Sequence, residues 1–199
     1  LSTALAKVQR LKVRVPGDQL KRNVSEIEEA LRSLSVLSGK LLELAKAEGA
    51  GALSKNRQDL VPILAMIVQD FEDKAPGRIV LSLPKREINS YLDPDAFAIL
   101  IRNLIENALK HGSQNQPVEV NLEDDGTLRV CNGGDIVPPD QLTLLRNRFA
   151  RSKTDASGSG LGLAIADAIT RGAGMTLHLR SPTTRRQDGF EAQIDIASA

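Results

Sequence analysis

Four polar residues of one predicted helix have side chains that could bind a metal ion and phosphate. They share the side opposite the apolar face of the helix and are Asn103, Asn107, Lys110 and His111. Amide oxygens are ligands for a hard cation such as Mg²⁺, and the Lys110 ammonium group adds a charge for phosphate. Spacing alone favours an ordinary amphipathic helix with a wet side, so the chemical argument depends on the residue types.

A glycine-rich run later in the chain could bring the backbone close to phosphate. Its sequence is Gly-Ser-Gly-Leu-Gly-Leu, over Gly158–Leu163. Glycine lets a backbone approach an anion closely, and the helix predicted to follow would present its first N–H groups and its positive dipole end. A flexible linker is the alternative, but the aliphatic continuation through Ala164 and Ile165 disfavours it.

A third segment, Val130–Pro138, changes from a strand pattern to a glycine-rich bend that alone predicts only a turn. In this order and at these separations, the segments resemble the N, G1 and G2 boxes of the ATP-binding fold that histidine kinases, DNA gyrase and the MutL repair proteins share. The stretch Asn-Leu-Ile-Glu-Asn-Ala-Leu-Lys-His at 103–111 matches the N box, and Phe149 with Arg148 and Arg151 looks like the F box. The resemblance covers the chain from about Arg57 to its end.

That resemblance implies ATP and Mg²⁺ as ligands and assigns roles to residues. Asn107 would be the direct Mg²⁺ ligand and Asn103 would lie beside the metal and phosphates, while Lys110 and His111 would face the phosphates. Segment 150–157 would be a mobile lid, from which Arg151 would reach the phosphates. The rest of the implied ATP-binding set is Asn132, Gly134, Phe149, Gly158, Gly160, Leu161, Gly162 and Leu163.

Two positions of the G1 segment depart from the family pattern. The family usually has Asp, whose carboxylate accepts a hydrogen bond from the adenine amino group, where this chain has Asn132. An amide oxygen accepts without a charge, so we expect weaker nucleotide binding. Ile136 stands where a second glycine is common, which would stiffen or reshape the turn.

The elements that must hold these residues begin with a helical hairpin at 1–51. An apolar stripe from Leu1 to Val15 ends at Pro16-Gly17-Asp18, and a longer stripe runs from Leu20 to Ala45. The longer stripe is a heptad seam with one polar interruption at Ser38. A narrow seam needs other helices, so we expect an antiparallel hairpin that forms a dimeric four-helix bundle; packing of the seam on the second domain is the alternative.

The remainder, 56–199, is predicted to be an α/β sandwich, which makes the whole chain α+β. Helices are expected at 60–71, from Pro94 to about 110 behind an Asp93 N-cap, and from 161 to about 171. Strands are expected at 78–83, 118–123, 127–130, 175–180 and 190–196. Strands separated by both hairpins and helices predict a mixed sheet with helices on one face. By the resemblance, this is the Bergerat (GHKL) ATP-binding fold.

Composition excludes several classes of protein. The 199 residues are 41% hydrophobic and 26% charged with a formal net charge of +1, which is typical of globular protein and gives no reason to expect nucleic acid as a partner. One cysteine, Cys131, excludes an intramolecular disulfide, and two histidines without acidic partners at ligand spacing predict no zinc site. No apolar run approaches the ~20 residues of a membrane span.

The predicted hairpin resembles the dimerisation and phosphotransfer domain of sensor histidine kinases, and this implies a reaction and a location. ATP would phosphorylate a histidine, and the phosphoryl group would pass to an Asp of a response-regulator receiver domain. Such kinases commonly also dephosphorylate the regulator. The chain would be the cytoplasmic portion of a bacterial inner-membrane protein and a homodimer through its hairpin.

The acceptor histidine of that family lies just before a Pro and an aliphatic run on the first hairpin helix, so it is expected just before Leu1. His111 belongs to the N box and His178 to a predicted strand, so neither is a suitable acceptor. No catalytic residue in the sense of a phosphoryl acceptor is therefore expected in this chain. Alone, it should bind ATP without phosphorylating itself.

Two other functions remain open. A gyrase- or MutL-type ATPase would carry a Glu, the base for water, four residues before the metal-binding Asn, where this chain has Asn103. The other is a non-catalytic nucleotide-binding dimer module, against which Asn107 and the glycine run argue. Phosphoryl transfer needs positioning and charge neutralisation, which the predicted site supplies, so the sequence favours a histidine kinase.

Overall fold

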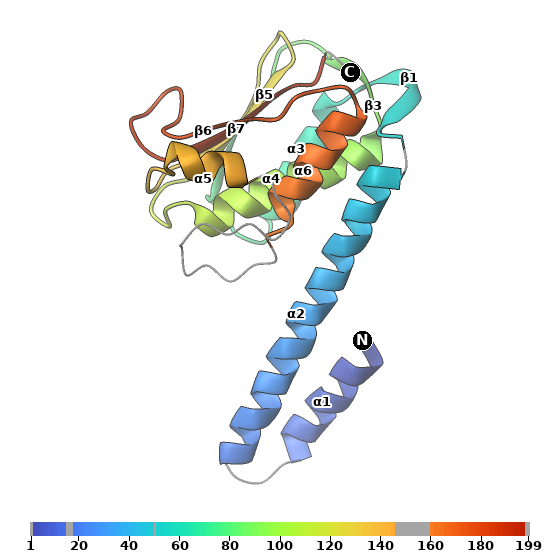
Figure 1. The fold of residues 1–199 in the computed structure, drawn as a ribbon, viewed down its shortest axis with the longest axis vertical. Helices are drawn as coiled ribbons and strands as arrows, with labels where there is room; N and C mark the ends of the chain where they lie inside the picture. Colours follow the sequence, from blue (N-terminus) through green and yellow to red (C-terminus); the bar gives the residue numbers. More distant parts are fainter. Residues whose placement is uncertain (1, 15–17, 50, 146–159, 198–199) are drawn as a thin grey trace. The chain divides into compact units, whose positions relative to one another are not determined.

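The computed structural model describes residues 2–14, 18–49, 51–145 and 160–197 (Figure 1). The chain forms two compact units, Leu1–Leu42 and Glu43–Ala199. One helix, α2, begins in the first unit and ends in the second, so its last turns belong to the second unit. The division into folding domains at 1–51 and 56–199 stays a prediction.

The first unit contains the two predicted helices, α1 (Ser2–Arg14) and most of α2 (Asp18–Gly49). They share a polar cluster around Glu28, whose side chain is nearly buried. Its carboxylate accepts hydrogen bonds from Arg32 (2.7 Å), Lys12 (3.0 Å) and Gln9 (3.4 Å). These bonds, that of Arg32 first, lower the pKa of Glu28 from 4.5 to about 2. The cluster therefore links α1 to α2 through an ionised carboxylate.

Acid should loosen this link. Because the folded pKa of Glu28 is depressed, its contribution is fully present above pH 4.5 and is lost as pH falls from there towards 2. We expect the melting temperature, followed by circular dichroism at 222 nm, to fall across that window in wild type. The fall should be shallower in Glu28→Gln, which should also melt lower at pH 7. Glu29→Gln, at an exposed position next in sequence, is the control, and an equal slope in all three proteins would contradict the prediction.

The second unit is a mixed α and β structure. After α2 its elements are β1 (Leu53–Asp59), α3 (Val61–Glu72), β2 (Ile79–Ser82), β3 (Asn89–Leu92), α4 (Pro94–His111), β4 (Val118–Leu122), β5 (Thr127–Asn132), α5 (Pro139–Leu144), α6 (Gly162–Gly172), β6 (His178–Arg180) and β7 (Phe190–Asp195). The predicted helices and strands are all present, within a few residues of their expected ends. None of the helices in the described ranges is long and apolar enough to cross a membrane.

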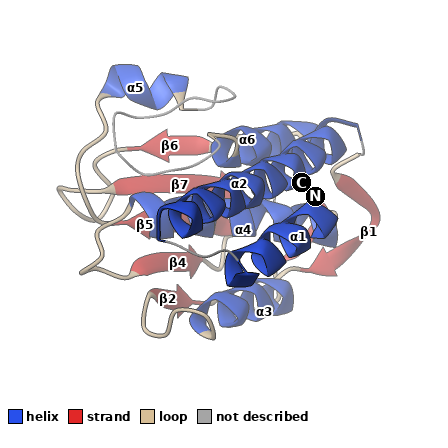
Figure 2. Cartoon of the chain, turned by 90° about the horizontal axis from the view of Figure 1, so that it is seen from below, coloured by secondary structure: helices blue, strands red, loops and turns tan. Residues whose placement is uncertain are grey.

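The main sheet has five strands in the order β2-β4-β5-β7-β6, in which β2 and β4 are parallel and the other pairs antiparallel. Helices α3, α4 and α6 cover one face of it (Figure 2). Phe97 and Ile101 of α4, Leu128 of β5 and Ile165 of α6 are buried in the core between these layers. This confirms the predicted α+β class, a helical hairpin followed by an α/β sandwich.

The sequence does not predict three of the elements, β1, β3 and α5. Strands β1 and β3 form a separate two-stranded sheet, and their register shifts between Leu53 and Gln58. Because of that irregularity the polar strand β1 has no alternating pattern, and β3 has only four residues. Helix α5 buries none of its residues, so it has no apolar stripe from which to predict it.

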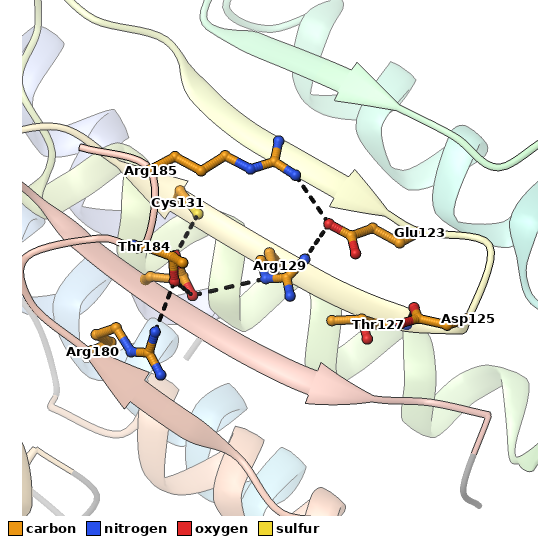
Figure 3. A network of polar contacts seen from close by, with 9 residues as sticks. Glu123, Asp125, Thr127, Arg129, Cys131, Arg180, Thr184 and Arg185 are labelled. Carbon is orange, nitrogen blue, oxygen red and sulfur yellow. Dashed lines mark hydrogen bonds and ion pairs between the residues drawn. The ribbon is translucent and has the colours of Figure 1, made fainter.

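The sheet face opposite the helices carries a network of charged and polar side chains (Figure 3). Buried Glu191 of β7 accepts hydrogen bonds from the Thr184 hydroxyl (2.8 Å) and backbone N–H (2.9 Å), and from the Cys131 thiol at 3.7 Å. Arg129 pairs with Glu123. Burial, followed by the negative charges of Glu191 and Glu119, raises the pKa of the Cys131 thiol to about 12. The only cysteine is therefore an unreactive structural side chain.

Candidate nucleotide-binding site

Helix α4 begins where the sequence predicts and carries the N-box segment. The Asp93 carboxylate accepts hydrogen bonds from the backbone N–H groups of Asp95 (2.9 Å) and Ala96 (3.1 Å), and Pro94 occupies the first turn. Its buried residues include the predicted apolar face, Phe97, Ile101, Leu104 and Ala108. The cap and this face together fix the rotation of the helix, and with it the directions of the polar residues in its second half.

The sequence predicts Asn103 on a wet side of α4, but the structure buries it: the residue is 1% exposed. The reason is that this side of the helix packs against α6 and that Glu43, near the end of α2, reaches the Asn103 amide. Asn103 Nδ2 donates to the backbone carbonyl of Ile99 (2.8 Å) and to Oε2 of Glu43 in α2 (3.1 Å). On the other side, a Cβ added to Gly162 of α6 would lie 3.5 Å from Asn103 Oδ1. The N and G2 segments are therefore in direct contact.

The other N-box residues lie nearer to solvent. Asn107 is half-buried one turn after Asn103, and Lys110 is exposed in the last turn of α4. Desolvation, and secondarily the charge of Lys110, lower the pKa of His111 below its usual 6.5. The neutral imidazole is thus favoured at neutral pH. The C-terminal half of α4 presents an amide, an ammonium group and a neutral imidazole.

The end of α4 meets the end of β5 through glycine. The Ser113 N–H donates to the Gly133 carbonyl at 2.9 Å, and a Cβ on Gly112 would come within 2.8 Å of Asn132 Cβ. A Cβ on Gly189 would come within 2.0 Å of the Asn132 backbone oxygen. The N and G1 segments can approach each other this closely because Gly112 lacks a side chain, and the turn before β7 can approach the G1 segment because Gly189 lacks one.

Gly112 and Gly189 are absent from the residues that the sequence nominates for the site. Each has a local signal that is easily assigned to a turn alone: Gly112 directly follows the last helical residue, and Gly189 belongs to an Asp-Gly pair. Gly134, which is among the nominated residues, has a φ of 132° and accepts a hydrogen bond from the Gly189 N–H at 2.8 Å.

Asn132, at the end of β5, has a buried acceptor that the described residues do not satisfy. The residue is 4% exposed, and its Nδ2 donates to the Gly133 carbonyl at 3.0 Å. Its Oδ1 is buried and receives no hydrogen bond from the described part of the chain. An unsatisfied buried acceptor costs about 1–3 kcal/mol, so an N–H donor that reached this oxygen would be stabilised by it. The adenine amino group is a donor of this kind.

Replacing Asn132 with Asp should tighten nucleotide binding. A charged acceptor makes a stronger hydrogen bond to an N–H donor than a neutral one, by about 1 kcal/mol, or roughly fivefold in affinity. Isothermal titration calorimetry with ATP and Mg²⁺ should show this gain in Asn132→Asp. The control is Asn56→Asp, which adds the same charge at an exposed position of β1. Because Asp cannot donate to the Gly133 carbonyl as Asn132 Nδ2 does, melting temperatures are measured in parallel. A lower affinity without a loss of stability in Asn132→Asp would show that no donor of the ligand meets this side chain.

The described part of the G2 segment leads into α6. Gly160 has a φ of 66°, a conformation that favours glycine. Leu161 and Leu163 are buried, so their side chains anchor the segment in the core, and only their backbone is available to a ligand. Leu161 stands at the N-cap and supplies no side-chain hydrogen bond to the first turn of α6. This arrangement suits an anion at the positive end of the helix.

Three nominated residues, Phe149, Arg151 and Gly158, lie outside the described residues, as does the predicted lid at 150–157. Within the described ranges, no group of three or more His, Cys, Asp or Glu could hold a metal ion. A cation at this site would instead depend on amide oxygen, phosphate and water. Mg²⁺ commonly binds to proteins in this way, with few protein ligands.

Comparison with known proteins gives a consistent result. A family described as histidine kinase-, DNA gyrase B-, and HSP90-like ATPase matches residues 92–197. The chain is 29% identical over 178 residues, 86% of its length, to the sensor protein KdpD of Escherichia coli. It is 31% identical over 138 residues, 69% of its length, to the sensor protein QseC of the same species. It spans only 20% and 30% of the length of these two relatives.

Among solved structures, full-length ShkA in complex with AMPPNP superposes with a TM-score of 0.65 and 20% sequence identity. The match covers 96% of this chain and 41% of that one. At this identity the likeness shows the fold, which includes both the helical hairpin and the sandwich.

Proposed function

Because this chain belongs to the sensor histidine kinases, within the histidine kinase-, DNA gyrase B- and HSP90-like ATPases, we propose that it is the kinase part of a two-component sensor. Its second unit would bind ATP with Mg²⁺ and donate the γ-phosphoryl group to a histidine. From there the group would pass to an Asp of a response-regulator receiver domain. The observation that carries the proposal is the buried Oδ1 of Asn132 at the meeting point of α4 and β5, which no hydrogen bond from the described residues satisfies.

The proposal gives each part of the site one task. Asn132 would bind the adenine amino group, and the backbone at Gly160 and Gly162 would approach the phosphates. Lys110 would neutralise phosphate charge. Asn107 would be the Mg²⁺ ligand; when bound, the metal neutralises charge on the transferred group, as phosphoryl transfer requires. The protein would contribute positioning and charge, with no covalent step on these residues.

The phosphoryl acceptor would come from outside this chain. His178 lies in β6, and His111 ends the helix that carries the proposed metal ligand, so neither would be the acceptor. We place the acceptor upstream of Leu1 in the whole protein, which would be a membrane-anchored sensor with this part in the cytoplasm. Dephosphorylation of the regulator stays a prediction.

A water-activating ATPase is the alternative function, and the identity of residue 103 separates the two. A base for water must be a proton acceptor, and an amide is a poor one. Asn103 also donates both described hydrogen bonds through Nδ2, which supports a positioning role for it. The chain therefore suits phosphoryl transfer to a protein side chain better than transfer to water.

The test is a chain extended about twenty residues upstream of Leu1 and incubated with γ-labelled ATP and Mg²⁺. We expect label on the protein that is labile in acid and stable in base, as phosphohistidine is. Transfer of that label to a receiver domain would establish the second step. Release of free phosphate without labelling of the protein would favour the ATPase. If neither labelled protein nor free phosphate forms, both functions would be rejected.

A further inference from the structure

We propose that Glu43, near the end of α2, is a positioning residue of the nucleotide site that holds the side-chain amide of Asn103 in one orientation. This inference rests on the proposed function, because it concerns how that site is assembled. Glu43 is 60 residues away from Asn103 in sequence, and its Oε2 lies 3.1 Å from Asn103 Nδ2.

The orientation follows from the number of donors on the amide. A primary amide has two N–H donors and one oxygen acceptor. Asn103 Nδ2 donates to the Glu43 carboxylate and to the Ile99 carbonyl at 2.8 Å. Both donors therefore point away from α6, and Oδ1 is the atom that faces it. The 3.5 Å spacing between Oδ1 and a Cβ added to Gly162 agrees with this arrangement.

Glu43 makes the opposite orientation costly. If the amide turned by 180°, Asn103 Oδ1 would face a carboxylate and a carbonyl, both of them acceptors. Asn103 is 1% exposed, so water could not easily relieve that contact. A hydrogen bond to a carboxylate is also roughly twice as strong as a neutral one. The carboxylate thus selects which end of the amide is presented to the first residue of α6.

The turn that carries Glu43 is itself fixed within the second unit. Its neighbour Leu44 is buried. A Cβ on Gly172, at the end of α6, would lie 3.7 Å from the Ala47 carbonyl oxygen and 3.4 Å from Ala52 Cβ. The end of α2 and the residues that follow it therefore lie beside the end of α6, while α2 begins as far back as Asp18. A rotation or shift of the last turns of α2 would move Glu43 relative to Asn103.

The experiment compares three changes on α2 by calorimetry with ATP and Mg²⁺. Glu43→Leu removes the acceptor, and we expect about tenfold weaker binding. Glu43→Gln keeps an acceptor oxygen without the charge, so binding should weaken about threefold, a partial rescue. Glu29→Gln removes the same charge from an exposed turn of the same helix and should bind as wild type does. Equal affinity of Glu43→Leu and wild type would overturn the inference.

A double-mutant cycle separates positioning from simple stability. If Glu43 acts through Asn103, then Glu43→Leu should cause no further loss of affinity in an Asn103→Ala background. Additive losses would overturn the inference. Where Asn103→Ala does not fold, Asn103→Ser takes its place, with melting temperatures measured for every variant. The Asn103 side-chain NH₂ signals in a ¹⁵N–¹H spectrum should shift in Glu43→Gln and stay unchanged in Glu29→Gln.

Failure of this inference and failure of the proposed function give different results. Wild-type affinity in Glu43→Leu, together with a large loss in Asn107→Ala, would reject the role of Glu43 and leave the proposed site in place. No binding by the wild-type chain, or no loss in Asn107→Ala, would reject the proposed site itself. The inference is supported only where both variants lose affinity and Glu43→Gln lies between Glu43→Leu and wild type.

Discussion

Asn107→Ala should lower the affinity for ATP about 100-fold in the presence of Mg²⁺. Asn107 is half-buried on α4, one turn after Asn103 and one turn before Lys110. In the proposed site it is the only protein ligand of the metal. Loss of a group that merely supports a metal ligand typically weakens metal binding by about 10–100-fold, so loss of the ligand itself should cost at least as much. The measurement is calorimetry with ATP and Mg²⁺ on the chain as it stands.

Removal of the metal provides an internal control for this prediction. In excess EDTA, wild type and Asn107→Ala should bind ATP with equal, weak affinity, because Asn107 acts through Mg²⁺. Asn56→Ala, at an exposed position of β1, should match wild type under both conditions. A loss in Asn107→Ala that persists in EDTA would mean that the side chain contacts the nucleotide or the fold directly. The metal assignment would then be wrong.

The sequence predicts α4 well because the signals that define it are local. Asp93 and Pro94 specify its start, and the apolar residues that follow specify the face it buries. The order of the N, G1 and G2 segments then predicts which helix and which strand lie together. Contacts such as that of Ser113 with Gly133 are consistent with that order.

What the sequence leaves out is the part of the site that depends on contacts between distant residues. Periodicity assigns Asn103 to a polar side, but a buried amide is stable there because Glu43, 60 residues earlier, accepts its hydrogen bond. The contact of Gly189 with Asn132 likewise joins a turn to a strand 57 positions away in the chain. Neither partner can be identified from local residue type and spacing alone.

Strand β1 shows the same limit for secondary structure. Its residues are mostly exposed and polar, and it pairs with β3 through an irregular register. Pairing with a strand some thirty residues later stabilises it, so its own sequence carries no period-two pattern. Local patterns thus recover the elements that bury a regular face and miss those held mainly by pairing.

The second large effect concerns the hairpin, where we expect Ile27→Asp combined with Leu34→Asp to convert a dimer into a monomer. Within the first unit, apolar residues of α2 remain exposed at intervals of seven: Leu20 (49%), Ile27 (52%), Leu34 (52%) and Leu41 (44%). Because each such side chain is already about half covered, its complete burial is worth roughly 1 kcal/mol, and an unpaired carboxylate in its place is costly. The dissociation constant should rise by more than about 100-fold, as measured by light scattering coupled to size-exclusion chromatography.

Val36→Asp is the matched control, because Val36 is more exposed (61%) but lies off the seam. The residues one and two heptads before it are charged, Glu29 and Arg22, so this side of α2 is expected to face water in a bundle. The seam variant should keep its affinity for ATP, since the proposed nucleotide site belongs to the second unit. If it remains a dimer and instead melts at a lower temperature, the seam stabilises each chain internally. The four-helix bundle would then have to be abandoned as the way in which two copies associate.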